Sequence, residues 1–131
     1  MKNWWVYVLR LEEGKYYVGI TSQTPEIRMQ EHLQHIRGAN WTKLYPPIEI
    51  YYKEELGVIK KEDAEAIENL MTRKYMRQFG LNSARGGDLT KVEEYSKFFG
   101  KIYMKFETDA LLIMLMLLFF IFVLTVLSFF K

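Results

Sequence analysis

Residues 4–21 read WWVYVLRLEEGKYYVGIT, and this stretch decides how the fold begins. Residues 4–11 are rich in aromatic and β-branched side chains, which favour strands, and residues 16–21 repeat the pattern. The charged segment 12–15 between them contains a glycine and is typical of a hairpin connection. The stretch therefore predicts two neighbouring antiparallel strands that both carry tyrosines.

A helix, a third strand and a second helix are expected after this hairpin. Thr24-Pro25-Glu26-Ile27 is a strong helix start, because a threonine cap, a proline at the first helical position and an early acidic residue occur together. This helix should end near Gly38. Prolines break the chain before residues 48–53, which alternate enough to form a strand. Residues 61–79 carry apolar side chains at helical spacing.

This order predicts an α/β domain over residues 1–90, with a small three-stranded antiparallel sheet flanked by helices in the order β-β-α-β-α. The domain is almost neutral, because it holds 13 lysines and arginines against 12 aspartates and glutamates. Binding of nucleic acid by bulk positive charge is therefore not indicated. A phosphate contact would have to come from a local cluster among the scattered basic residues, which include Arg28, Arg37, Lys43, Arg73, Lys74, Arg77 and Arg85.

Residues 110–130 read ALLIMLMLLFFIFVLTVLSFF and contain no charge, and their only polar side chains are Thr125 and Ser128. A helix of about 21 residues is roughly 31 Å long, which matches a hydrocarbon core of about 30 Å. A buried core helix would need a domain large enough to surround it, and residues 1–90 cannot supply one. The segment is therefore predicted to be a transmembrane helix.

The flanking charges predict how this helix is oriented. Lys91, Lys97, Lys101 and Lys105 precede it and Lys131 follows it, so the positive-inside tendency places the folded domain in the cytoplasm. The first residues contain no apolar run long enough for a signal peptide, so a single-pass anchor at the C-terminal end is expected. The absence of cysteine agrees with a reducing compartment.

Residues 91–109 are expected to form an amphipathic juxtamembrane helix. Apolar residues recur at spacings of three and four, and lysines form a stripe four residues apart. Such a helix would lie at the lipid interface. The alternatives are a helix packed on the folded domain or on a second copy of the chain. The apolar residues are Val92, Tyr95, Phe99, Ile102 and Phe106, and the lysines are Lys97, Lys101 and Lys105.

Residues 4–90 resemble the GIY-YIG endonuclease domain. Trp5-Val6-Tyr7 stands where the family has its first motif, and Tyr17-Val18-Gly19 stands where it has the second. Two departures occur: Trp5 replaces the glycine of the first motif, and valine replaces isoleucine in both. These are backbone and packing positions, so the departures place the implied activity in little doubt.

Further residues match the family in order and approximate spacing. Arg28 is followed four residues later by His32, as in the family, and Glu68 lies where the family has its metal-binding glutamate on the following helix. Trp41-Thr42 resembles the segment that leads into the third strand, and Arg85-Gly86-Gly87 resembles the ending of a subset of these domains. The resemblance implies an endonuclease that hydrolyses phosphodiester bonds in nucleic acid, with Mg²⁺ or Mn²⁺ as cofactor. DNA is favoured over RNA as the substrate, and the sequence itself leaves that choice open.

The residue types suit this chemistry, which needs an activated water, neutralisation of phosphate charge and help for the leaving oxygen. Glu68 could hold Mg²⁺, which commonly takes one or two carboxylates besides water and phosphate oxygens. Arg28 offers a permanently charged fork for the scissile phosphate. His32 lies on the same helical face as Arg28 and could orient a tyrosine or relay a proton.

The resemblance implies that Tyr7 or Tyr17 activates the water, and the sequence leaves open which of them does. A phenol has an unperturbed pKa of about 10, so the role needs a nearby cation or a metal-bound hydroxide. Each of these residues also has an ordinary structural explanation, and only their joint occurrence favours a nuclease. Asn82 follows a helix and is normally a cap or turn residue, so it is included only as a supporting site residue.

Two classes of function follow from these observations. The first is a membrane-anchored, metal-dependent endonuclease. The second is a non-catalytic module that holds nucleic acid or a protein near the bilayer. The joint presence of Tyr7, Tyr17, Arg28, His32 and Glu68 favours the first class. A binding module has no need of the carboxylate, which repels phosphate unless a metal intervenes. A soluble domain that only mediates assembly ranks last, and the sequence leaves the oligomeric state open.

Overall fold

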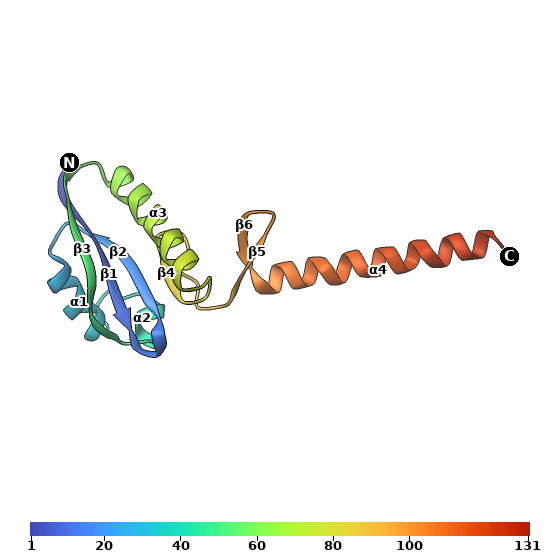
Figure 1. The fold of residues 1–131 in the computed structure, drawn as a ribbon, viewed down its shortest axis with the longest axis horizontal. Coiled ribbons are helices and arrows are strands. Elements are labelled where there is room, and N and C mark those ends of the chain that lie inside the picture. The colour runs from blue at the N-terminus through green and yellow to red at the C-terminus, as the bar shows by residue number, and fades with distance from the viewer. The chain divides into compact units, whose positions relative to one another are not determined.

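The computed structural model describes the backbone of residues 1–131 and every side chain except that of Phe98. It divides into two compact units, residues 1–92 and 93–131. The first contains a mixed sheet with helices on both faces. The second contains a short hairpin followed by one long helix (Figure 1).

The sheet of the first unit has four strands in the order β3-β1-β2-β4. β1 (Lys2–Leu11) is antiparallel to both β2 (Tyr16–Thr21) and β3 (Pro47–Ile59). β4 (Ala84–Gly86) runs parallel to β2. The prediction of three strands is therefore wrong by one strand, because a strand of three residues is too short to show any periodicity.

Three helices belong to this unit. α1 (Pro25–Leu33) begins as predicted, since the Thr24 hydroxyl accepts a hydrogen bond from the Ile27 N–H at 3.4 Å. It ends earlier than Gly38, and the chain turns through residues with positive φ. α3 (Lys61–Phe79) has the predicted bounds. α2 (Asn40–Leu44) was not predicted, because five residues give too few helical repeats to recognise.

The helices cover opposite faces of the sheet. Tyr7, Leu9 and Leu11 point to one face and form a buried cluster with Trp41 of α2. Tyr16 points to the other face, where its ring stacks on Phe79 of α3 with centroids 4.2 Å apart. Because successive strand residues alternate between the faces, the neighbours Tyr16 and Tyr17 point to opposite faces of the sheet.

The second unit differs from the prediction over residues 91–109. Instead of an amphipathic helix, β5 (Tyr95–Phe98) and β6 (Lys101–Met104) form an antiparallel hairpin. α4 (Lys105–Phe129) then begins directly after it. The connection contains Gly100, which is unfavourable in a helix by about 1 kcal/mol relative to alanine but suits a tight turn. Aromatic and β-branched residues on both sides of it favour strands.

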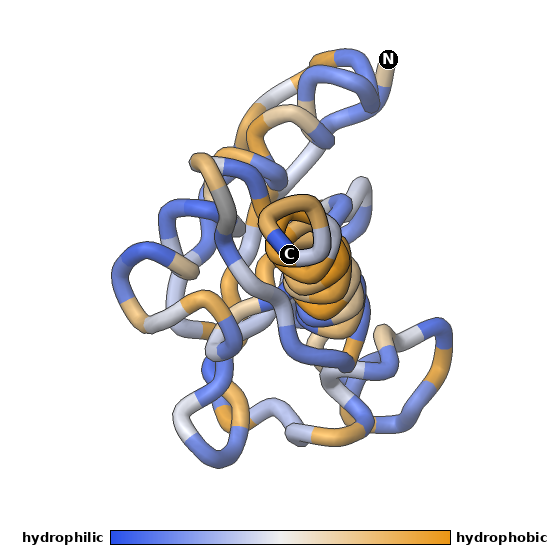
Figure 2. Tube along the Cα trace, turned by 90° about the vertical axis from the view of Figure 1, so that its right-hand side faces the viewer, coloured by the Kyte–Doolittle hydropathy of each residue, from blue (hydrophilic) through white to orange (hydrophobic). Residues whose placement is uncertain are grey.

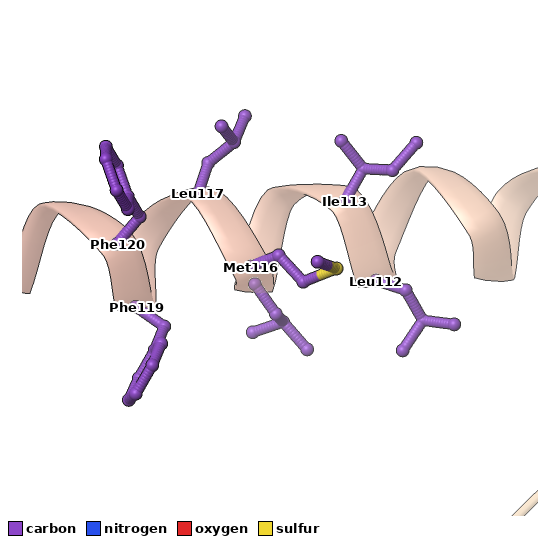
Figure 3. Close-up of a pocket in the computed structure, with 7 residues that line it drawn as sticks. Leu112, Ile113, Met116, Leu117, Phe119 and Phe120 are labelled. Atoms are coloured by element: carbon purple, nitrogen blue, oxygen red, sulfur yellow. The ribbon is translucent and has the colours of Figure 1, made fainter.

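α4 is long and apolar enough to cross a bilayer, and its central residues are not buried by the protein. It is coloured as hydrophobic along nearly its whole length in Figure 2. Figure 3 shows Ile113, Leu117 and Phe120 on one side of the helix and Leu112 and Phe119 on another. A helix that is apolar on all sides is suited to burial in lipid or in a large core.

Candidate active site

Two tyrosines on neighbouring strands form the base of the candidate site. Tyr7 lies directly opposite Gly19 in the β1–β2 register, and Tyr17 lies opposite Leu9 on the same face. The two rings have centroids 6.3 Å apart. A Cβ at position 19 would overlap the Tyr7 hydroxyl, so only glycine lets this ring lie across β2. The glycine of the second motif therefore serves the position of the first tyrosine.

His32 of α1 packs against both tyrosines and has no exposed surface. Its ring lies edge-on to Tyr17 with centroids 4.9 Å apart, and its Nε2 is 3.1 Å from the Tyr7 hydroxyl. Its Nδ1 is 2.9 Å from the hydroxyl oxygen of Thr42. His32 is thus held between two hydroxyl groups.

These contacts determine the tautomer of the neutral imidazole. The Thr42 hydroxyl donates its proton to the carbonyl of Ala39 at 2.9 Å, so it can only accept from His32 Nδ1–H. Nε2 is then the unprotonated nitrogen, and the Tyr7 hydroxyl donates to it. Burial, and secondarily the positive charge of Arg28, lower the pKa of His32 to about 4. At neutral pH the ring is an uncharged proton acceptor.

Arg28 of α1 reaches the same tyrosine from the side of the helix. Its guanidinium forms an ion pair with Glu31 and donates to the carbonyl of Arg37 at 3.3 Å. Arg37 also pairs with Glu31 at 2.7 Å, so one carboxylate holds two arginines. Arg28 lowers the pKa of Tyr7 through its charge and a side-chain hydrogen bond, although burial outweighs this effect and leaves that pKa raised. Burial likewise raises the pKa of Tyr17 to about 12.

Glu68 of α3 brings a carboxylate to this group. Its negative charge raises the pKa of both tyrosines. Burial raises its own pKa to about 7, against hydrogen bonds from the backbones of Gly87 and Ile20 that lower it. Gly87 has φ of 52°, and a Cβ there would overlap the Asn69 side chain. The second glycine of Arg85-Gly86-Gly87 therefore allows the chain to pass close to α3 beside Glu68.

The residues around Glu68 suit a hard divalent cation that keeps most of its water. Among the side chains that the structure describes, no group of three or more histidines, aspartates and glutamates could hold a metal. Mg²⁺ is commonly bound by one or two carboxylates together with substrate phosphates, so the single half-buried carboxylate of Glu68 fits it. Burial is the main cause of the raised pKa of Glu68, and a bound cation would lower that pKa.

The structure brings together five of the predicted site residues and assigns other roles to the rest. Tyr7, Tyr17, Arg28, His32 and Glu68 interact with one another as described. Asn82 instead accepts a hydrogen bond from Arg85 at 3.0 Å. Arg85, which was a candidate phosphate contact, is buried, donates to three backbone carbonyls and lies over the Trp41 ring at 4.5 Å. Its role is structural.

Three residues of the site were not recognised as such from the sequence. Thr42 orients His32, Glu31 holds Arg28, and Gly19 leaves room for Tyr7. Glu31 is three residues after Arg28, which is a spacing that brings helical side chains together and could have indicated the pair. Nothing in the sequence connects Thr42 to His32, because they come from different helices.

Comparisons with known proteins point to one family for this unit. The GIY-YIG catalytic domain matches residues 3–82. UPF0213 protein XAC3202 of Xanthomonas axonopodis pv. citri (strain 306) is 40% identical over 50 residues, which are 38% of this chain and 47% of that protein. The match thus spans about half the length of the relative. No solved structure matches the chain. From the extent of the domain match, this chain belongs to the GIY-YIG catalytic domain family.

Proposed function

We propose that this protein is a membrane-anchored endonuclease that hydrolyses phosphodiester bonds in DNA with the help of Mg²⁺ or Mn²⁺. One observation carries the proposal: a hydrogen-bonded tyrosine and histidine, an arginine and a half-buried carboxylate, contributed by β1, α1 and α3, act on the same phenol. Membership of a catalytic-domain family supports a nuclease activity. The kind of nucleic acid and the metal dependence are parts of the proposal.

Tyr7 and His32 act as a proton relay in the proposed reaction. The oxygen of a water attacks phosphorus while its proton passes to the Tyr7 oxygen, and the Tyr7 proton passes to His32 Nε2, which is 3.1 Å away. The bond from phosphorus to the leaving oxygen breaks in the same displacement, and the leaving oxygen takes a proton from solvent water. Because the raised pKa of Tyr7 disfavours a free phenolate, a relay is easier than prior ionisation. The geometry favours Tyr7 over Tyr17 as the base.

Arg28 and Glu68 help to neutralise the negative charge of the phosphate in the proposed reaction. Arg28 presents a fork to the scissile phosphate, while Glu31 holds the guanidinium in place from the helix side. Glu68 would hold the metal ion, which when bound supplies positive charge to the phosphate oxygens and keeps the carboxylate ionised. Thr42 keeps His32 in the tautomer that can receive a proton.

α4 supplies the proposed anchor, with the nuclease unit in the cytoplasm. Its 25 residues correspond to about 37 Å, which is enough to cross a hydrocarbon core of about 30 Å. The lysines that precede the apolar stretch support the orientation. The anchor would keep the site close to DNA that lies at or passes through a membrane.

The test is nicking of supercoiled plasmid by the full chain in detergent micelles, with Mg²⁺ and with EDTA. Wild type should nick only with Mg²⁺, and Glu68→Ala should be inactive. Glu62→Ala removes an exposed carboxylate from the first turn of the same helix and should stay active. Equal nicking by wild type and Glu68→Ala would overturn the metal assignment. Mg²⁺-dependent DNA binding without nicking would support the non-catalytic module instead.

A further inference from the structure

The β5–β6 hairpin is attached firmly to the first turn of α4. No residue separates the end of β6 at Met104 from the start of α4 at Lys105. The Ser96 and Thr108 hydroxyls are 2.6 Å apart. The Lys105 N–H donates to the Glu94 carbonyl at 2.8 Å, and its ammonium pairs with the Glu94 carboxylate at 2.9 Å. The hairpin therefore has a defined place beside the end of the helix, and in Figure 1 it projects to the side of α4.

The tip of this hairpin is an exposed aromatic residue in a strained conformation. The two residues between the strands, Phe99 and Gly100, have φ of 49° and 77°. Two-residue hairpin loops with positive φ at both positions prefer Asn-Gly, because a bulky side chain is strained at the first position. Phe99 is 91% exposed. The geometry of the turn therefore does not explain a phenylalanine at this position.

Positive charge lies on both sides of the tip. Lys97 pairs with Ile102 across the hairpin, so its side chain and that of the residue before Ile102, Lys101, point to opposite faces. Both lysines are exposed, and residues 95–104 contain no acidic residue. An apolar aromatic tip between two exposed lysines is suited to a surface with an apolar interior and a negatively charged outer layer.

The length of α4 determines where the hairpin lies along the bilayer normal when the helix spans a membrane. The uncharged stretch starts at Ala110, and about 21 residues fill the hydrocarbon core. Residues 105–109 contain three charged side chains, and at about 1.5 Å per residue they extend roughly 7 Å beyond the core, into the headgroup region. The hairpin is held to these residues. When α4 spans the bilayer, the hairpin is therefore at the level of the headgroups.

We propose that the β5–β6 hairpin is a second membrane contact, in which Phe99 enters the interface and Lys97 and Lys101 bind the headgroups of anionic phospholipids. Apolar side chains such as phenylalanine bury at the boundary between headgroups and acyl chains, and lysines near an anionic surface are attracted to it. The inference rests on the proposed membrane span. It adds a preference for anionic lipid that an apolar helix alone cannot supply.

Fluorescence quenching by lipids with brominated acyl chains tests the proposal. The full chain carrying Phe99→Trp, reconstituted in vesicles of phosphatidylglycerol and phosphatidylcholine, should lose emission in brominated lipid. Wild type, with native tryptophans only at positions 4, 5 and 41, gives the background. Leu118→Trp reports on the centre of α4. Phe99→Asn suits the turn, so it should keep the hairpin while weakening binding to anionic vesicles.

The lysine arm uses Lys97→Gln with Lys101→Gln in the Phe99→Trp chain. Each lysine near an anionic surface strengthens the binding of the hairpin to that surface about fivefold. In the double variant, the ratio of hairpins with residue 99 in the interface to hairpins without it should therefore fall by up to about 25-fold. Lys43→Gln with Lys74→Gln makes the same change of charge on exposed positions of the first unit and should have no effect. Equal quenching in neutral and anionic vesicles would overturn the lipid preference.

The experiment distinguishes failure of the membrane span of α4 from failure of the hairpin contact. Quenching in the Leu118→Trp chain without quenching in the Phe99→Trp chain would leave the span intact and overturn the hairpin contact. Quenching in neither chain would overturn the span, and the hairpin contact with it. Emission from the Phe99→Trp chain that responds to added DNA but not to brominated lipid would also overturn the inference and assign the hairpin to nucleic acid.

Discussion

His32 takes its role from two hydroxyl groups that contact its opposite ring nitrogens. Tyr7 lies at Nε2 and Thr42 at Nδ1, and the ring is completely buried between them. The threonine has no chemistry of its own in the proposed reaction. It determines which nitrogen is free, and so decides whether Tyr7 can give up a proton. Thr42 is therefore a positioning residue.

Replacing Thr42 by valine tests this role. Thr42→Val keeps the shape but leaves His32 Nδ1–H without an acceptor, which costs about 1–3 kcal/mol of unfolding free energy. Nicking should fall by about tenfold or more, because the other tautomer becomes accessible. Imidazole ¹⁵N chemical shifts should report the mixed tautomers. Thr72→Val is the control for the loss of a buried hydroxyl, since Thr72 is equally buried and donates to the Glu68 backbone carbonyl, so it should leave the His32 shifts unchanged. Unchanged shifts in Thr42→Val would contradict the assignment.

The lowered pKa of His32 also predicts how stability depends on pH. A histidine in the unfolded chain has a pKa of about 6.5, and His32 in the folded chain has a pKa of about 4. Between these values the unfolded state binds the proton and the native state does not. The free energy of unfolding should therefore fall as pH falls from about 6.5 to about 4, by up to about 3 kcal/mol.

Denaturant titrations of three proteins separate this effect from other groups. Glu68 has a raised pKa and acts in the opposite direction, so the loss of stability must be compared between wild type and His32→Gln. The pH dependence should be shallower in His32→Gln. His35→Gln changes the exposed histidine and should keep the wild-type dependence. The same dependence in all three proteins would mean that His32 is protonated normally.

At the scale of elements, the β1–β2 pair works because one of its residues has no side chain. Gly19→Ala would push the Tyr7 ring away from its position across β2. We expect a loss of about 1–3 kcal/mol in unfolding free energy and a strong loss of nicking. Gly14→Ala is a useful comparison, because Gly14 has φ of 68° with open space around it. That variant should lose stability through backbone strain and keep its activity. Loss of nicking in both would indicate a general sensitivity of the hairpin.

The elements that were predicted correctly from the sequence are those with strong local signals. β1, β2 and the start of α1 have clear strand composition or a capping residue, and α3 has nineteen residues of helical spacing. β4 and α2 are too short for a pattern and are formed by tertiary contacts. The hairpin of residues 95–104 was mistaken for a helix, because spacings of three and four outweighed the signal of Gly100.

The candidate site divides in the same way. Tyr7, Tyr17, Arg28, His32 and Glu68 could be predicted because the residues that meet in space also occur in a recognisable order. Thr42 and the ion pair of Arg37 with Glu31 depend on how the loop after α1 turns, which involves positive φ at His35 and Arg37. Residues 35 and 37 are not glycines, so this turn had no local signal.

At the scale of the molecule, the orientation of α4 would decide which nucleic acid the proposed site can reach when the helix spans a membrane. If the first unit is cytoplasmic, protease added outside intact cells should leave it undigested, and permeabilised cells should lose it. The chain contains no cysteine, so a single cysteine can be labelled selectively. Glu13→Cys on the exposed β1–β2 turn should react with a membrane-impermeant maleimide only after permeabilisation.

The flanking charges can be exchanged to test the orientation. Replacing Lys97, Lys101 and Lys105 by glutamine, with three lysines added after Phe130, should reverse the orientation in a fraction of molecules, because positively charged flanks stay in the cytoplasm. Digestion or labelling of the wild-type chain in intact cells would place the site on the outer side, where it would meet incoming rather than resident DNA.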